Sequence, residues 1–370
     1  MDFNKKTTMR RNIKLLLFCL LLVFFTKTAH SQFDTISLSS LKLKGTIQSI
    51  KDYTSSAEDS LGIINNGKLL YDDDEYKFKF EDYSVKSNFN LKYDIYGNNI
   101  EKSDRNRSSI YFLYKQNKIV EKNETRFYQE GNVNLKYIYL YNNDGNIIKI
   151  TIYRNEILWE KLIYEYNENG LPIRLYEIDA DGEITEKEDW KYNKNKISSK
   201  NKYGDYPTKY NYLYDENGKL IEETTTHTFS DNSKFRYTKR YEYQNNKILK
   251  EVHFNDSIQT AVKDYIYNGL KLVETINIFS GKDNSRFIKT VTEYNDGKTS
   301  KETIEDKEET VIKEFDENEN VIRLFYQFNN NKTDEYIYQY TFDDKKNWIK
   351  IIEFKNTIPT KIRNREIEYF

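Results

Sequence analysis

The acidic stretch from Glu177 to Glu188 has the spacing of an EF-hand calcium loop. Gly182 stands at position 6, where such a loop turns, and Ile184 and Glu188 stand at positions 8 and 12. Position 1 is Glu177, although an aspartate is expected there, and the flanking residues alternate like β-strands. We therefore interpret the stretch as an acidic hairpin turn, and we expect no metal site and no cofactor.

Histidine is rare and cysteine is absent after the first 31 positions. His227 and His253 are the two histidines there, and no His or Cys stands at metal-ligand spacing beside them. Gly-x-Ser-x-Gly, His-Glu-x-x-His and a phosphate-binding glycine loop are absent. Paired carboxylates, as in glycosidases, leave an enzyme on a β scaffold as an alternative, but a chain this acidic brings carboxylates together in any fold. We predict a protein without catalytic residues, which is not an enzyme.

The tryptophans are candidates for a flat ligand-binding surface. Trp190 stands in an alternating aromatic row, and Trp348 replaces an aliphatic residue after a turn, so both indicate packing. Trp159 is out of register with Tyr164 and Tyr166. It is the candidate ligand-binding residue, with packing as the simpler interpretation.

A repeated phrase of about 25 residues must position all of these side chains. It consists of an aromatic-x-aromatic pair, a short turn with Asn, Asp or Gly, a Lys or amide residue, and then aliphatics, as in Tyr212 to Glu222. Its second aromatic residue recurs ten times: Tyr114, Tyr141, Tyr166, Tyr192, Tyr214, Tyr243, Tyr267, Tyr294, Phe315 and Tyr340. A second turn, such as Asn155-Glu156, separates successive phrases, so each unit contains two strands.

The turn residues indicate antiparallel hairpins. Asp296-Gly297 suits a two-residue turn with positive φ, and Asn217-Gly218 suits a longer loop with glycine in the left-handed conformation. The alternating tyrosines of each phrase share one face of the sheet. About 22 strands in sequential order exceed what an open twisted sheet holds. We predict an all-β fold in which tandem antiparallel β-hairpins form a wound or spiral sheet, a solenoid.

The phrase Tyr214-Asp215-x-x-Gly218-x-Leu220 resembles the YD repeats of Rhs-type and teneurin-like proteins, and looser copies begin at Tyr93 and Tyr141. The resemblance covers roughly residues 90 to 370. It implies a spiralling shell of β-hairpins, which in that family encloses a toxin domain in some members and is proposed to bind carbohydrate in others. This chain has no Rhs core region and its hairpins continue to Phe370, so we expect the architecture without a C-terminal toxin.

The first 31 residues have the organisation of a secretory signal peptide. Basic residues precede the uncharged apolar run Leu15–Phe25, and small residues stand just before Gln32, where we expect cleavage. Eleven apolar residues fall short of the roughly 20 that a spanning helix needs. Phe18 before Cys19 argues against lipid attachment, and cleavage leaves no cysteine for a disulfide.

The expected organisation has three parts: a signal peptide over 1–31, an N-terminal β capping region over 32–90 and a YD-like β-hairpin repeat domain over 91–370. Within the capping region, alternation predicts a strand over Lys42–Tyr53, and Asn66-Gly67 predicts a hairpin turn within Ile64–Leu70.

Charge and aromatic content give the expected function. Removal of six Lys/Arg and one Asp with the signal peptide leaves 52 basic and 58 acidic residues, a net charge of −6. This balance argues against nucleic acid or an anionic membrane as a partner. An exported, tyrosine-rich repeat surface predicts a non-catalytic binding or scaffold protein, either secreted or in the periplasm or at the cell surface. We expect a polysaccharide or a surface protein as its partner.

An outer-membrane β-barrel is the alternative function. An exported chain with about 22 strands suits such a barrel, but its strands need an uninterrupted apolar face toward lipid. Lys239 shares a face with Tyr237 and Tyr241, and charged residues recur on both faces of most strands. We therefore expect no membrane span after cleavage.

Export is directly testable. The succession of basic, apolar and small residues predicts that the protein isolated from its host begins at or next to Gln32. Intact-mass spectrometry measures this, and a chain that retains Met1 would contradict the prediction.

Overall fold

The computed structural model describes residues 41, 43–70, 89–104, 107–204, 206–269, 271–279 and 286–370. The predicted signal peptide and Lys42 lie outside the described residues. Among the described residues, no helix is long and apolar enough to span a membrane.

The described residues form 25 strands. In chain order they are β1 (Ile47–Ser60), β2 (Ile63–Leu69), β3 (Phe89–Tyr93), β4 (Asn99–Asp104), β5 (Ser108–Lys115), β6 (Lys118–Arg126), β7 (Val133–Tyr141), β8 (Ile147–Arg154), β9 (Ile157–Tyr166), β10 (Pro172–Asp179), β11 (Ile184–Asn193), β12 (Lys196–Tyr203), β13 (Thr208–Tyr214), β14 (Leu220–Thr228), β15 (Lys234–Gln244), β16 (Lys247–Asn255), β17 (Ile258–Asn268), β18 (Lys271–Phe279), β19 (Arg286–Asn295), β20 (Lys298–Asp306), β21 (Glu309–Phe315), β22 (Val321–Phe328), β23 (Thr333–Phe342), β24 (Trp348–Lys355) and β25 (Ile358–Tyr369).

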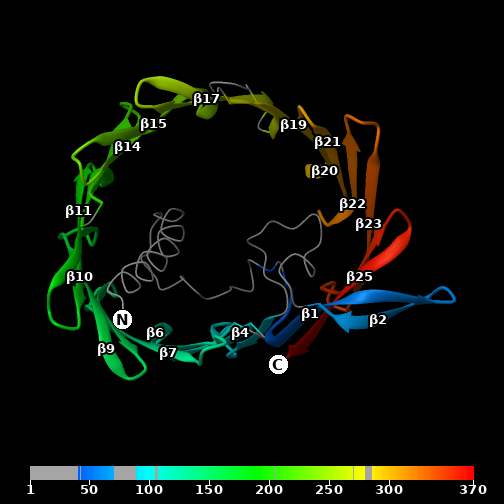
Figure 1. Cartoon of the computed structure of the whole chain (residues 1–370), viewed down its shortest axis with the longest axis horizontal. Coiled ribbons are helices and arrows are strands. Elements are labelled where there is room, and N and C mark those ends of the chain that lie inside the picture. The colour runs from blue at the N-terminus through cyan, green and yellow to red at the C-terminus, as the bar shows by residue number, and fades with distance from the viewer. Residues whose placement is uncertain are drawn as a thin grey trace.

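The sheet closes into a barrel. From β3 to β25 each strand pairs antiparallel with the next, and β1 pairs with both β25 and β3, which completes a 24-stranded ring. Figure 1 shows this ring end-on, with β1 beside β25 and the C-terminus next to them. The predicted wound or spiral solenoid is therefore wrong, although the all-β hairpin order is confirmed. Closure removes both edges of the sheet, which a spiral would leave open.

The N-terminal hairpin differs from its prediction. Ile64 to Leu70 does not turn at Asn66-Gly67, because Ile63–Leu69 is the single strand β2, which pairs with the second half of β1. The turn lies at Leu61 and Gly62, which have φ values of 57° and 84°. The β1–β2 hairpin projects outward from the ring (Figure 1).

The predicted turn chemistry is confirmed in the repeats. Asp296 and Gly297 both have positive φ, 45° and 90°, as a two-residue hairpin turn requires. Gly218 has φ 78° in the longer loop, where Asp215 Oδ1 accepts a hydrogen bond of 2.7 Å from the Lys219 backbone N–H. The aspartate of the phrase therefore closes its own turn.

The second tyrosine of the phrase ties neighbouring hairpins together. The Tyr141 hydroxyl donates a hydrogen bond of 2.7 Å to the Ile119 carbonyl, and Tyr166 does the same to Ile147. The same bond recurs from Tyr114 to Asn99, Tyr192 to Pro172, Tyr243 to Leu220, Tyr294 to Leu272 and Tyr340 to Val321. Each acceptor lies just after the preceding tyrosine turn, where the bulge in the strand register leaves a carbonyl to be satisfied.

The lysine after the turn has a matching role. Lys118 Nζ lies 5.3 Å from the ring centroid of Tyr141, the tyrosine of the next hairpin. The same stacking joins Lys196 to Tyr214, Lys219 to Tyr243, Lys247 to Tyr267 and Lys271 to Tyr294. Cation–π contact and hydroxyl bond together explain why the phrase keeps a Lys after the turn and a Tyr before it.

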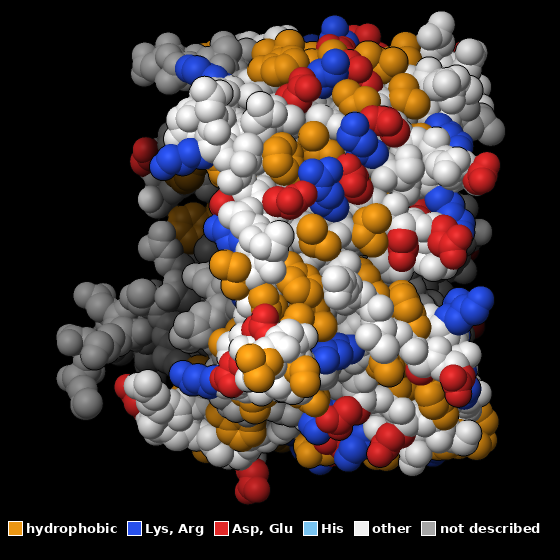
Figure 2. Space-filling model, turned by 90° about the vertical axis from the view of Figure 1, so that its right-hand side faces the viewer, with side chains coloured by type: hydrophobic (Ala, Val, Ile, Leu, Met, Phe, Trp, Pro, Cys, Tyr) orange, Lys and Arg blue, Asp and Glu red, His pale blue; other side chains and the backbone are white. Residues whose placement is uncertain are grey.

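The closed sheet forms the wall of the barrel, and this wall has two unlike faces. The tyrosine face contains Tyr137, Tyr139 and Tyr141 with their register partners, and the buried apolar clusters of β5–β6 and β22–β24 lie on it. The opposite face holds the alternate residues, among them Leu113 and Leu140, each more than half exposed. On the side of the molecule near β23 and β25, apolar side chains are interleaved with charged ones (Figure 2).

The seam between β1 and β25 carries a buried ion cluster. Asp52 is completely buried, and its two carboxylate oxygens accept hydrogen bonds from Arg363 Nε at 2.7 Å and Arg365 Nη2 at 3.0 Å. Arg365 also stacks at 3.5 Å on the ring of Trp348. An apolar cluster of Ile47, Ile50, Phe89, Leu91 and Tyr93 packs beside the charges.

The ion cluster predicts how strongly the seam depends on Asp52. Asp52→Ala removes the buried carboxylate that Arg363 and Arg365 share, so we expect the free energy of unfolding to fall by about 3–5 kcal/mol. Urea denaturation measures it. The control is Lys51→Ala, which removes an exposed pair with Glu366 and is expected to cost at most about 1 kcal/mol. Equal losses in the two variants would contradict the role of Asp52.

Candidate functional site

The EF-hand-like stretch forms the β10–β11 hairpin. Glu177 pairs with Glu186 across the hairpin, and Asp179 Oδ1 accepts hydrogen bonds of 3.0 Å from the backbone N–H groups of Asp181 and Glu183. The interpretation as a hairpin turn is thus confirmed. Among the described residues, no three His, Cys, Asp or Glu side chains converge as metal ligands would.

The histidines lie in strands, and His253 belongs to a hydrogen-bonded row on the tyrosine face. Its Nδ1 lies 2.8 Å from the Tyr237 hydroxyl, and its Nε2 lies 2.6 Å from Glu251 Oε1. Tyr265 donates to the other oxygen of Glu251 at 2.9 Å. His227 lies apart from this row, with its Nδ1 3.1 Å from the Thr208 hydroxyl.

Two members of this row have shifted pKa values. Burial alone would raise the pKa of Glu251, but the hydrogen bonds from His253 and Tyr265 outweigh it and keep that pKa below its usual value. Burial and the bond to Glu251 raise the pKa of Tyr265 far above its usual value. A carboxylate that stays ionised and a tyrosine that stays neutral are both far from the pKa that a catalyst needs near neutral pH. The hydrogen bond between Tyr265 and Glu251 therefore joins β17 to β16 in the wall.

The three tryptophans differ in exposure, as their positions in the repeated phrase predict. Trp190 is buried and Trp348 packs among apolar residues of β22–β24 beneath Arg365, which confirms packing for both. Trp159 is 38% exposed, and the guanidinium of Arg154 lies 4.9 Å from its ring centroid. Its role in ligand binding stays a prediction.

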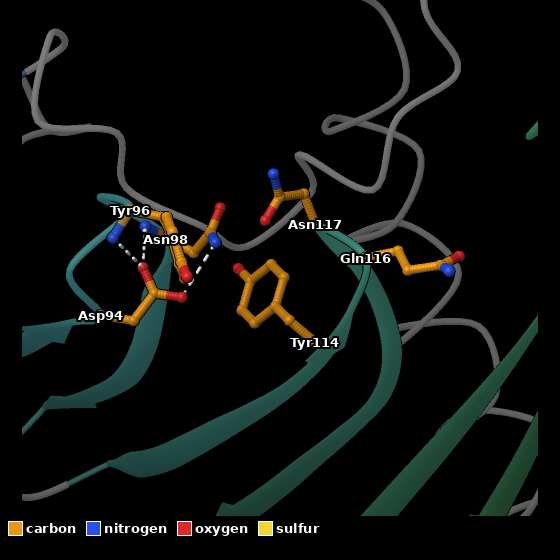
Figure 3. Close-up of a pocket in the computed structure, with 6 residues that line it drawn as sticks. All are labelled: Asp94, Tyr96, Asn98, Tyr114, Gln116 and Asn117. Atoms are coloured by element: carbon orange, nitrogen blue, oxygen red, sulfur yellow. Dashed lines mark hydrogen bonds between the residues drawn. The ribbon is translucent and has the colours of Figure 1, made fainter.

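A shallow pocket lies between the β3–β4 and β5–β6 turns (Figure 3). It has a volume of about 590 Å³ and is lined by Asp94, Tyr96, Asn98, Tyr114, Gln116 and Asn117. Asp94 is occupied by its own turn, because its Oδ1 accepts from the backbone N–H groups of Tyr96 and Asn98 at 2.9 Å. The pocket offers amide groups, an exposed tyrosine ring and a carboxylate that is engaged in its own turn.

Sequence reasoning missed this pocket. Its signal was the early copy of the phrase at Tyr93-Asp94, but nothing local showed that the turns of two successive hairpins would leave a hollow between them.

No protein-family model and no curated protein matches this chain. Among solved structures, a porin-like protein from Bacteroides uniformis matches 67% of this chain and 95% of its own, with 12% identity and a TM-score of 0.25. A porin-like protein from Bacteroides vulgatus matches 64% of this chain and 94% of its own, with 12% identity and a TM-score of 0.18. TcdB2-TccC3 without its hypervariable C-terminal region matches 84% of this chain and 23% of its own, with 10% identity and a TM-score of 0.24.

TM-scores this low mean that the chains do not superpose as wholes. The likeness establishes neither the fold nor the function of this protein, and the resemblance to YD repeats stays a prediction.

The tyrosines that bond to carbonyls make the barrel sensitive to alkali. Burial raises the pKa of Tyr114, Tyr166 and Tyr192 to about 12, whereas an unfolded tyrosine titrates near 10. The folded state thus favours the neutral hydroxyl. This stabilisation is complete below about pH 10 and is lost as the pH rises toward about 12.

We expect the free energy of unfolding to fall between about pH 8 and about pH 11. Urea denaturation followed with tyrosinate absorbance measures it. The variant with Tyr114→Phe, Tyr166→Phe and Tyr192→Phe should be less stable at the lower pH and should lose less on going to the higher one. An unchanged alkaline loss in this variant would contradict the assignment.

Proposed function

We propose that the protein is an exported, non-catalytic β-barrel that acts at the outer membrane or the cell surface. The observation that carries the proposal is the closure of the wall by β1 and β25, which makes the repeats one continuous ring. The ring of 24 strands has no free edge for pairing with other strands, so it suits a protein that works outside the cell without chaperones at hand.

The polar side chains support a role without catalysis. Asp94 and Asp179 hold turns, and Glu251 and His253 hold each other. The tyrosines are kept neutral by burial. These groups stabilise the wall, so we expect a partner to bind the outer surface of the barrel without a chemical reaction.

A barrel embedded in lipid through its whole wall is the second candidate, and one row of side chains favours it. Just before the second tyrosine of the phrase, on the opposite face, stand Leu113, Leu140, Leu213 and Ile266, each at least 44% exposed. An apolar row at one height is what a lipid-facing wall needs.

Charges interrupt that row. The corresponding positions of other strands hold Glu165, Lys191, Glu242 and Glu293. The tyrosine face is no better suited to lipid, because it carries charged residues such as Glu188 and its partner Lys200. Each Lys or Arg at the middle of a bilayer costs about 2–4 kcal/mol, with acids somewhat less. The wall therefore suits water on both faces, as the mixed surface of Figure 2 illustrates for one side.

Fractionation of the host tests the proposal. We expect the processed chain with the outer-membrane or cell-surface fraction, and we expect a wash with salt and urea to release it without detergent. A chain that leaves the membrane only in detergent would favour the lipid-embedded barrel instead. A chain found in the cytoplasm would contradict export and the proposed function together.

A further inference from the structure

The two ends of the barrel differ in the residues that they expose. Because neighbouring strands run in opposite directions, the turns after the tyrosines form one rim, the tyrosine rim, and the turns between successive phrases form the other, the distal rim. From β5 to β18, the described turns of the tyrosine rim consist of Asn, Asp, Glu, Gly, Lys and Gln, apart from the partly buried Leu171. The β3–β4 turn of the same rim differs, because it exposes Ile95 at 63% and Tyr96 at 76%.

Six consecutive hairpins of the distal rim each expose a large apolar side chain. They run from β6–β7 to β16–β17, and the side chains are between 40% and 73% exposed: Phe127, Tyr128, Ile157, Ile184, Tyr206, Phe229 and Ile258. We call this set the rim arc. Single exposed apolar residues are ordinary on a protein surface, but recurrence in six successive hairpins on one rim is a pattern.

Turn geometry does not require these apolar residues. On the tyrosine rim, the two-residue turns Lys194-Asn195 and Asn245-Asn246 are each followed by lysine. On the distal rim, the equivalent turn Asn155-Glu156 is followed by Ile157. The same backbone conformation with positive φ thus carries lysine at one end of the barrel and isoleucine at the other.

The shape of the rim arc favours a broad partner over a groove-binding one. Successive turns on one rim are offset by two strand spacings, which places them about 10 Å apart along the sheet. The arc therefore extends over about 50 Å. Its apolar side chains stand singly among polar residues, so each can enter a lipid interface separately, whereas a protein partner would have to desolvate the polar residues between them.

The charge pattern decides which broad partner fits. Exposed acids outnumber exposed basic residues along the arc: Glu130, Glu156, Asp181, Glu183, Asp231 and Asp256 stand against Arg107, Lys209 and Lys234. A second copy docked rim to rim would bring these acids against their own counterparts, and anionic lipids would repel them. Zwitterionic headgroups instead present amine or trimethylammonium groups to the carboxylates while the apolar side chains reach the acyl boundary.

We propose that the rim arc docks the barrel onto a zwitterionic lipid surface, with the wall standing in water. The proposal rests on the proposed envelope location and adds the mode of attachment. It accounts for the exposed apolar residues of six successive distal turns, where turn geometry does not require them.

Vesicle sedimentation tests the docking. The processed chain, purified from its host, is spun with vesicles of phosphatidylcholine alone and with vesicles that contain phosphatidylglycerol in equal amount. We expect binding to the first and weaker binding to the second at low salt. The variant with Ile157→Ser, Phe229→Ser and Ile258→Ser should lose about tenfold in affinity, and Ile157→Ser alone should lose a smaller part.

The matched control replaces three exposed apolar residues of the wall with serine. Leu113→Ser, Leu213→Ser and Ile266→Ser remove three exposed apolar side chains from the opposite face, and vesicle affinity should stay unchanged. Far-ultraviolet dichroism and urea denaturation establish that each variant folds, and the single variant serves if the triple does not.

Several results would overturn the proposal: no binding to phosphatidylcholine, a requirement for anionic lipid, equal losses in the rim and wall variants, or a dimer in solution that only the rim variant abolishes. The last result would assign the arc to a second copy. Cytoplasmic location in the host, by contrast, would contradict the proposed function while leaving the vesicle result intact.

Discussion

The barrel depends on one buried charge cluster at its seam. Asp52 and the two arginines Arg363 and Arg365 leave water together, and they compensate one another only when β1 lies against β25 in the observed register. A shift of β1 by one residue against β25 would turn Asp52 to the face opposite Arg363 and Arg365 and separate the buried charges. The cluster therefore selects closure of this sheet at this point, and the apolar residues around Ile50 and Leu91 add the burial that holds it there.

Between the two ends of the chain, a pair of contacts recurs in many of the hairpins and stabilises the sheet. The tyrosine hydroxyl satisfies a carbonyl freed by the bulge in the preceding hairpin, and the lysine beyond the turn covers the ring of the next tyrosine. These contacts join neighbouring hairpins at one rim, in addition to the hydrogen bonds between the strands. A wall one sheet thick has no second layer to pack against, so amphipathic Tyr and Lys side chains supply the cover that a conventional core would give.

The structural use of polar side chains also bears on function. The side chains with reactive groups are engaged in turns, seams and rows, as Asp94, Asp179 and Glu251 illustrate. The wall alternates apolar and charged residues on the opposite face and carries ion pairs on the tyrosine face. The asymmetry between the rims is the feature that structural needs leave unexplained, since Ile157 and Lys196 follow turns of the same conformation. Docking of the rim arc onto a lipid surface would explain that asymmetry.

The sequence by itself determined the hairpins, because their signals are local. Asp296-Gly297 needs positive φ, Asp215 closes its own loop, and tyrosine alternation sets the faces, all within a few residues. It also led us to interpret Glu177 to Glu188 as a turn and Trp190 as a packed residue. It did not predict closure, the turn at Leu61-Gly62, the pocket beside Asp94 or the two rims. Only the tertiary structure decided these, because Asp52 and Arg363 are 311 residues apart, and no local pattern states that two such distant strands share a register.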